Sequence, residues 1–337
     1  MAQASVEMLD MDSTTIGESV PLAVLTPPDF DPATESLPIC ILLHGGGSDR
    51  FALVNDQHLY AQCWAGGSAQ RMVIVAPSSG PLRWYVDPWG DFIADELPAF
   101  MAERYSSRSD REGVVLTGRS MGGFGTLKTA FLRPDRFVAI AVHHPAVEPG
   151  FTRAAATPRN TFYRFTQTDD DLWGTPVDEE LWAADNPANL AVKHADAIRD
   201  SGMEIYIDAG DQDTLNLHDG TEFLHRTLWD LDIRHEYHLV RWADHVGTSI
   251  ARRVPESFQF LSDALGGGLS APKDLDLNEA EQAWSDWMSS GGQGEAQPID
   301  LSTERGPALL DIMMEPKRTP ALELDDTFAR SYGNLPN

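Results

Sequence analysis

The chain has 337 residues, and apolar residues make up 42% of it, which is enough for a large buried core. Its formal net charge is −27, from 25 basic and 52 acidic residues. Such a chain repels nucleic acid and anionic lipid, and no stretch of it has the roughly 20 apolar residues of a membrane helix. We therefore expect neither nucleic acid nor a membrane as a partner, whereas self-association into a homo-oligomer remains compatible with the sequence.

The N-terminal stretch MAQASVEMLDMDST has no basic start and no apolar run, so it does not have the pattern of a secretory signal. The two cysteines, Cys40 and Cys63, are too few for a disulfide framework and are expected to be buried thiols. Both features favour a cytoplasmic location.

Short apolar runs alternate with helical patterns along most of the chain. This alternation is typical of a mainly parallel sheet with helices on both faces, so we predict an α/β fold. Nothing helical separates the first two strands, which should therefore pair in antiparallel fashion. Strands are predicted at Ser5–Met11, Ser19–Leu25, 38–43, 72–77, 113–118, 137–145, 203–210 and 234–242, and helices at 56–70, 91–106, 121–134, 218–231 and 248–265.

Residues 1–268 are expected to form this catalytic domain, in which the irregular segment 146–192 is a candidate lid. Its Trp173 and Trp182 could equally be packing anchors. The character changes at the glycines that follow the last predicted helix. Residues 269–337 are expected to be an acidic extension, partly helical, as at 276–288, and partly disordered.

The strongest chemical signal is the segment Gly118-Arg119-Ser120-Met121-Gly122, which matches G-x-S-x-G between a buried strand and a helix. A serine on such a sharp turn has a strained backbone, and neighbouring glycines leave it the necessary room. The turn also places the serine at a helix N-terminus, where free amides favour a developing negative charge. We therefore predict that Ser120 is a nucleophile.

A second signal is His44-Gly45-Gly46-Gly47, which ends an earlier buried strand. Glycine-rich loops of this kind supply one oxyanion amide in lipases and esterases, and the residue after the nucleophile supplies the other. The amides of Gly46 and Met121 are therefore the predicted oxyanion hole, with Gly47 second to Gly46. His44 itself is expected to be structural.

A serine hydroxyl needs a histidine to take its proton and a carboxylate to orient that histidine. In the chain order Ser, acid, His, the acid follows a late strand, where we choose Asp213 and keep Asp211 as the alternative. A calcium loop starting at Asp211 is discounted, because Leu215 and Asn216 occupy its fifth and sixth positions. No metal and no cofactor is expected.

The base should lie in the loop after the last strand, which makes His245 the predicted general base. His235 and His238 lie within that strand and are expected to be surface or core residues. His143 and His144 are adjacent on another strand and therefore face opposite ways, which makes them a poor metal pair. One of the two could line the pocket.

These residues are similar to the Putative esterase branch of the α/β-hydrolases, which includes S-formylglutathione hydrolase (esterase D), feruloyl and tributyrin-type esterases, and mycolyltransferases. The resemblance covers roughly residues 18–265. It rests on GRSMGGFGTLKTAFLRPDRFVAIAV at 118–142, WYVD at 84–87, DNPANL at 185–190 and Gly210-x-x-Asp213. It implies an α/β-hydrolase fold and esterase activity.

Two departures from the family pattern stand out. Ala243-Asp244-His245-Val246-Gly247 replaces the usual Gly-x-His-x-Trp, and His143-His144-Pro145 stands where small residues are usual. The second departure could reshape the pocket for the acyl or leaving group.

The predicted reaction is hydrolysis of a carboxylic ester or thioester through a covalent acyl-enzyme. Trp84, Tyr85 and Trp64 are candidates for substrate binding, with core packing as the alternative for each. Acyl transfer to an acceptor other than water would use the same residues. A non-catalytic binding protein on this fold is the second alternative.

Overall fold

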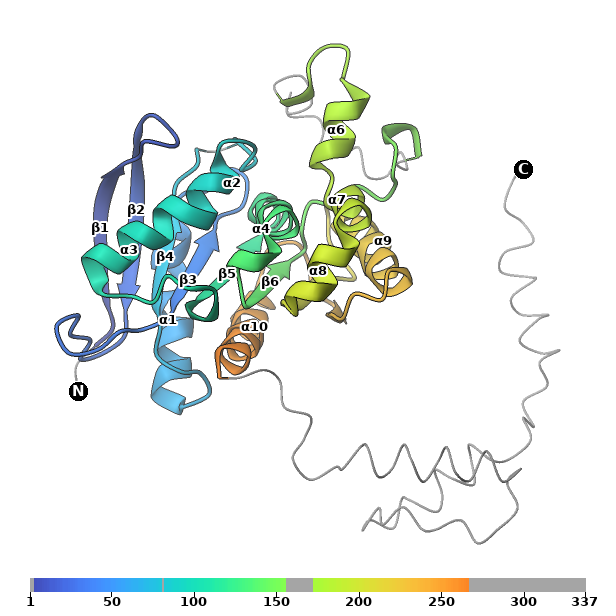
Figure 1. Cartoon of the computed structure of the whole chain (residues 1–337). Coiled ribbons are helices and arrows are strands. Elements are labelled where there is room, and N and C mark those ends of the chain that lie inside the picture. The colour runs from blue at the N-terminus through green and yellow to red at the C-terminus, as the bar shows by residue number, and fades with distance from the viewer. Residues whose placement is uncertain (1–2, 81, 156–171, 267–337) are drawn as a thin grey trace, which may run out of the picture. The chain divides into compact units, whose positions relative to one another are not determined.

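The computed structural model describes residues 3–80, 82–155 and 172–266. In these residues the chain forms one eight-stranded sheet with the order β1-β2-β4-β3-β5-β6-β7-β8 (Figure 1). β1 pairs with β2, and β2 with β4, in antiparallel fashion, whereas all other neighbours are parallel. The strands are β1 (Ser5–Asp12), β2 (Ser19–Thr26), β3 (Ile39–Leu43), β4 (Val73–Pro77), β5 (Val114–Arg119), β6 (Ala139–His143), β7 (Glu204–Gly210) and β8 (Glu236–Val240).

Helices cover both faces of this sheet, as the alternation of the sequence predicts. The helices are α1 (Phe51–Gly66), α2 (Trp89–Asp91), α3 (Leu97–Tyr105), α4 (Met121–Leu132), α6 (Glu179–Asp185), α7 (Pro187–Lys193), α8 (Ala195–Ser201), α9 (Leu217–Asp230) and α10 (Ile250–Leu265). The predicted fold class, a mainly parallel α/β sheet with one antiparallel edge, is confirmed.

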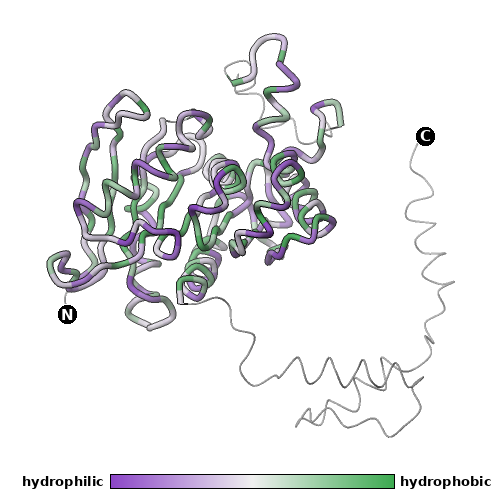
Figure 2. The backbone as a smooth tube through the Cα atoms, in the orientation of Figure 1, coloured by the Kyte–Doolittle hydropathy of each residue, from purple (hydrophilic) through white to green (hydrophobic). Residues whose placement is uncertain are grey.

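The core is divided by the sheet into two apolar clusters, because successive strand residues point to opposite faces. In β3, Ile39, Ile41 and Leu43 join one cluster, while Cys40 and Leu42 join the other. The first cluster packs against α3, α4 and α9, and the second against α1 and α10. Strands buried on both faces read as continuous apolar runs, and apolar colour concentrates along the central strands in Figure 2.

Two helices differ from their predicted bounds for local reasons. α1 begins at Phe51 rather than at 56, since the Asp49 carboxylate accepts the Phe51 N–H at 2.8 Å, and it ends before Gly67, whose φ is +68°. The predicted helix 91–106 is interrupted by a π-helix at Phe92–Glu96. Pro98 follows closely, and a proline has no N–H for the α-helical bond to residue 94.

Because β3, β5, β6, β7 and β8 are parallel, their carboxyl ends meet at one edge of the sheet. The predicted oxyanion loop, nucleophile, acid and base each follow one of these strands. The extension at 269–337, including the helix expected at 276–288, and the middle of the candidate lid, 156–171, lie outside the described residues.

Candidate active site

Ser120 lies between β5 and α4 with φ +54° and ψ −116°, a strained conformation for a residue other than glycine. The surrounding backbone fixes it: its N–H donates to the His143 carbonyl at 3.0 Å, and its own carbonyl accepts from Ala146 N–H at 3.1 Å. A Cβ at Gly118 would collide with the carbonyl of Gly122, and one at Gly122 with the carbonyl of Leu43. The glycines therefore permit the close approach of β3, β5 and α4 that the turn requires.

Asp213 and His245 form a hydrogen-bonded pair. Oδ2 of Asp213 lies 2.9 Å from Nδ1 of His245, and its Oδ1 accepts the Leu215 N–H at 2.8 Å. The Asp213 side chain is fully buried and that of His245 is 13% exposed. An ionised carboxylate can only accept, so it keeps the proton of a neutral His245 on Nδ1 and leaves Nε2 as the basic nitrogen.

The loops after β7 and β8, which carry Asp213 and His245, are joined by close packing and hydrogen bonds. A Cβ at Gly210 would collide with the Ala243 carbonyl, so glycine is required where the two loops meet. Asp211, the alternative acid, accepts the Trp242 N–H at 2.6 Å. It thus holds the loop after β8 rather than the imidazole of His245.

Asp244, which sequence reasoning left without a role, makes similar contacts. Its Oδ1 accepts the backbone N–H groups of His245 at 2.6 Å and Thr214 at 3.0 Å. These hydrogen bonds, with that from His245 the largest cause, lower the pKa of Asp244. Asp244 thus joins the loop of the predicted acid to the loop of the predicted base.

The glycine-rich loop after β3 lies beside the nucleophile. The position of a Cβ on Gly45 would be 3.7 Å from the Cβ of Ser120, and Gly47 has φ +73°. His44 fixes the start of this loop, since its Nε2 accepts the Ser79 N–H at 3.1 Å and its Nδ1 donates to the Gly45 carbonyl at 2.9 Å. Burial lowers the pKa of His44, which is therefore neutral at pH 7.

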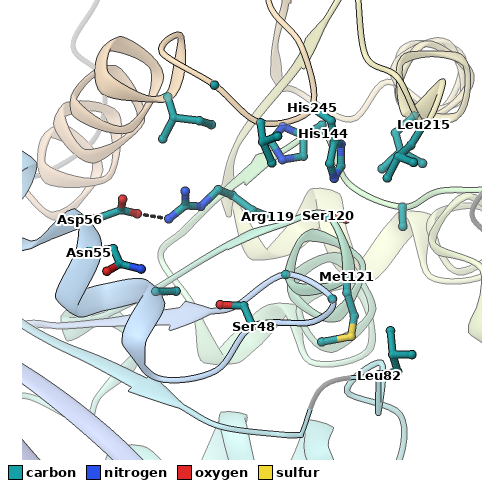
Figure 3. A pocket seen from close by; sticks show the side chains of 18 of the residues that line it. Ser48, Asn55, Asp56, Leu82, Arg119, Ser120, Met121, His144, Leu215 and His245 are labelled. Atoms are coloured by element: carbon teal, nitrogen blue, oxygen red, sulfur yellow. Dashed lines mark hydrogen bonds and ion pairs between the residues drawn. The ribbon is translucent and has the colours of Figure 1, made fainter.

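A cavity of about 650 Å³ opens over these residues (Figure 3). Ser120 and His245 both line it, together with Gly46 and Met121 of the predicted oxyanion hole. One part of its wall is polar and another is apolar. The polar lining comprises Ser48, Asn55, Asp56, Arg119 and His144, and the apolar lining includes Leu82, Trp84, Ala146, Leu215, Leu217, Val246 and Ile250.

The three aromatic candidates for substrate binding do not lie together. Trp84 lines the cavity. Tyr85 is fully buried in the core instead, where its hydroxyl donates to the His44 carbonyl at 3.3 Å and its ring covers Gly125. Trp64 packs edge-on against Phe258 on the α10 side of the sheet. Neither Tyr85 nor Trp64 is a lining residue of this cavity, so both occupy the packing role left open by the sequence.

The described parts of the candidate lid are the segments 146–155 and 172–192. In the second of these, Trp173 and Trp182 are buried, and Nε1 of Trp173 donates to Asp185 at 2.8 Å. Of the described residues in both segments, Ala146 alone lines the cavity. These contacts match packing anchors, the alternative that the sequence left open for the two tryptophans.

Arg119 and Asp56 form an ion pair in the polar wall, which Figure 3 shows as a dashed line between α1 and the end of β5. Burial and the positive charge of Arg253 lower the pKa of Arg119 to about 10, so it remains charged at pH 7. The residue between the first glycine and the serine of the G-x-S-x-G motif therefore contributes a charged side chain to the cavity.

His144, Asp213 and His245 each offer a ligand atom within 4.8 Å of the others, the geometry of a candidate metal site. Oδ2 of Asp213 and Nδ1 of His245 already share a hydrogen bond, and Arg253 lies 2.8 Å from Nδ1 of His144. The nearby guanidinium charge opposes a cation. The donor set thus fits a hydrogen-bonded acid–base pair better than a metal centre.

In this structure the carboxyl ends of the parallel strands carry a serine on a sharp turn, an aspartate–histidine pair and a glycine-rich loop. This arrangement on a mainly parallel sheet is that of the α/β-hydrolase fold. Known proteins of similar structure have this fold. A ferulic acid esterase superposes with a TM-score of 0.65 and 17% identity over 79% of this chain and all of that one. An S-formylglutathione hydrolase from Agrobacterium tumefaciens gives 0.62 and 20% over 79% and 97%. A fluorophosphonate-binding serine hydrolase from Staphylococcus aureus gives 0.60 and 19% over 78% and 99%.

The sequence comparisons lead from the fold to a family. The model of the Putative esterase family matches residues 13–246, so the chain belongs to that family. Among curated proteins, an esterase of Mycobacterium tuberculosis is 28% identical over 140 residues, which are 39% of this chain. The match spans only 30% of the length of that relative. None of the described helices is long and apolar enough to cross a bilayer.

Proposed function

We propose that this protein is an esterase that hydrolyses carboxylic esters or thioesters in two steps, with Ser120 as the nucleophile and Asp213 and His245 as its acid–base pair. The observation that carries the proposal is the presence of Ser120 and His245 in the wall of one cavity, with Asp213 bonded to the far nitrogen of the imidazole. Serine activation needs an imidazole that can reach the hydroxyl and a carboxylate that orients this imidazole, and these residues can supply both.

In the first step Nε2 of His245 takes the hydroxyl proton while Oγ of Ser120 attacks the carbonyl carbon. The carbonyl oxygen becomes an anion, which the N–H groups of Gly46 and Met121 stabilise. The imidazolium of His245, stabilised by Asp213, then gives its proton to the alcohol or thiol as the bond to it breaks, leaving the acyl group on Ser120. In the second step water, deprotonated by His245, releases the acid and restores the serine.

The cavity suggests the size of the substrate. A volume of about 650 Å³ is typical of a site for a small molecule, and the apolar wall formed by residues such as Leu217 and Ile250 suits a hydrocarbon acyl or alcohol group. Small-molecule esters, rather than a large polymer threaded through the site, are the proposed substrates.

A series of p-nitrophenyl esters from acetyl to lauroyl tests the proposal, with thioesters of the same acyl groups as a second arm. We expect turnover by the wild-type protein and its loss by at least about a thousandfold in Ser120→Ala. Ser68→Ala, which changes a serine just after α1 that does not line the cavity, is the matched control and should retain full activity. Equal turnover by both variants would refute Ser120 as the nucleophile. Faster product formation with an added alcohol, accompanied by a new ester, would indicate acyl transfer.

A further inference from the structure

His144 follows β6 and lines the cavity beside the predicted base. Its ring centroid is 4.3 Å from that of His245, with the two planes tilted by 55°, and the residue is only 2% exposed. Figure 3 shows the two imidazoles side by side above Ser120. Its φ of +37° is unusual for a residue with a side chain, so the surrounding structure must hold it in this place.

Arg253 of α10 determines which nitrogen of His144 carries the proton. Its Nη2 lies 2.8 Å from Nδ1 of His144. A guanidinium can only donate, so Nδ1 must accept, and the proton of the neutral ring must be on Nε2. Burial, followed by the positive fields of His245 and Arg253, lowers the pKa of His144 well below its usual value. The ring is therefore neutral with a defined tautomer.

A buried network in turn holds Arg253, whose side chain is completely inaccessible. Both Nε, at 3.1 Å, and Nη2 donate to Oδ1 of Asp208, and Oδ2 of the same carboxylate lies 2.7 Å from Nδ1 of His143. Burial alone would raise the pKa of Asp208, but the charge and hydrogen bond of His143, and then Arg253, lower it to about 2. The carboxylate therefore keeps the guanidinium in position at every pH at which the enzyme would work.

The Nε2–H of His144 is left without a hydrogen-bond partner in the described part of the chain. When a bound substrate displaces water from the cavity, an N–H group that finds no acceptor on the substrate weakens binding. A site with such a donor therefore discriminates strongly against analogues that lack the acceptor. A second general base is excluded by the same geometry, because Nε2 already carries a proton and Nδ1 faces a cation.

We propose that His144 is a specificity-determining residue, which donates a hydrogen bond from Nε2 to a substrate oxygen close to the scissile ester. The favoured substrates are esters whose acyl or alcohol group carries an ether, hydroxyl or oxo oxygen there, rather than plain alkyl esters. The inference rests on the proposed function of Ser120, but it concerns substrate choice and not the ability to cleave an ester.

Two pairs of esters test it, each exchanging one methylene for oxygen at nearly constant size. p-Nitrophenyl methoxyacetate and butyrate probe the acyl side, and 2-methoxyethyl and butyl acetate probe the alcohol side. The measurement is the ratio of kcat/KM within each pair, compared between wild type and His144→Phe. Intrinsic differences in ester reactivity are common to both proteins and cancel in this comparison.

In one of the two pairs we expect the wild-type preference for the oxygen ester to fall by roughly fivefold to tenfold in His144→Phe, which keeps a ring but loses the donor. His144→Gln, whose amide can place a donor near the former Nε2, should restore part of the preference. Unchanged ratios in both pairs, or an equal loss on all four esters, would overturn the inference. Absence of turnover by the wild type itself would instead refute the proposed function.

A measurement on the unmodified protein guards against misfolded variants. The nitrogen NMR shifts of His144 should show a neutral ring protonated on Nε2 throughout the range from about pH 5 to 8. A ring that titrates in this range, or that carries its proton on Nδ1, would contradict the proposed donor.

Discussion

At the scale of single residues, the site depends on which carboxylate meets His245. Two aspartates follow β7 within three residues, and only their contacts distinguish them. Asp213 bonds Nδ1 of the imidazole, whereas Asp211 bonds the backbone of Trp242. Asp213 therefore orients the imidazole that would take the serine proton, whereas Asp211 holds the loop on which His245 lies.

Replacement of each aspartate by asparagine should separate these roles. Asp213→Asn removes the acceptor that fixes the tautomer of His245, and we expect kcat to fall by about ten-thousandfold. Asp211→Asn keeps an oxygen for the Trp242 N–H and should lower kcat by less than about tenfold. Steady-state kinetics on one p-nitrophenyl ester compares the two. A larger loss in Asp211→Asn would reverse the assignment.

The sequence predicted Ser120, Asp213 and His245 because each follows a recognisable strand in a known order. It could not predict that Arg253 determines the tautomer of His144, since 109 positions separate the two residues and only the packing of α10 on the sheet joins them. Tyr85 and Trp64 were candidates on residue type alone. Residue type does not reveal which face of a loop or helix meets the cavity.

At the scale of elements, the crossing of α4 over β3 and β5 determines where the serine turn lies. Within this helix, Gly122 faces the backbone of Leu43 and His44, and Gly125 faces the ring of Tyr85, whose atoms would lie 2.7 Å from an added Cβ. The helix thus approaches the sheet more closely than side chains would permit. The glycine spacing predicted the turn, but the π-helix before Pro98 could not be read from a pattern of apolar residues.

Gly122→Ala should therefore displace α4 and destabilise the fold by about 1–3 kcal/mol, the usual cost of overpacking. Thermal unfolding and ester turnover are the measurements, and both should fall. Gly66→Ala near the end of α1 is the matched control, since an added Cβ there meets nothing within 4 Å. It should leave stability unchanged or raise it by about 0.5 kcal/mol. Equal stability of both variants would contradict the close packing of α4.

At the scale of the whole molecule, acid stability depends on buried ionisable groups in several elements. The pKa values of His44 and His144 are lowered by burial, so below the unfolded value of 6.5 the unfolded chain binds protons that the folded chain does not. Stability is complete above pH 6.5 and decreases as the pH falls. Asp208 adds a second window, because its pKa of about 2 lies below the unfolded value of 3.8.

Chemical unfolding at a series of pH values should show both windows. The contribution of Asp208 is present above pH 3.8 and is lost as the pH falls toward 2, by about 2 kcal/mol. Asp208→Asn should be less stable at pH 7, where Arg253 loses its counter-charge, yet its stability should change less between these two pH values. If the free energy of unfolding of the variant fell between these two pH values by as much as that of the wild type, the role of the buried ion pair would be contradicted.

The net charge of −27 is also a property of the whole molecule. It affects solubility and the rate of association with charged molecules rather than the fold. The order of apolar runs along the chain predicted the fold class, because alternating elements and strands buried on both faces leave a clear pattern. The role of the acidic residues in 269–337 stays a matter of composition, since that segment lies outside the described residues.

The most direct test of the account is covalent labelling of the nucleophile. The protein is treated with a fluorophosphonate, digested, and the modified peptide is identified by mass spectrometry. We predict a single label on Ser120, no label in Ser120→Ala, and labelling slowed by at least about a hundredfold in His245→Ala, in which the hydroxyl has lost its base. Labelling of another residue, or a rate that does not depend on His245, would contradict serine catalysis at this site.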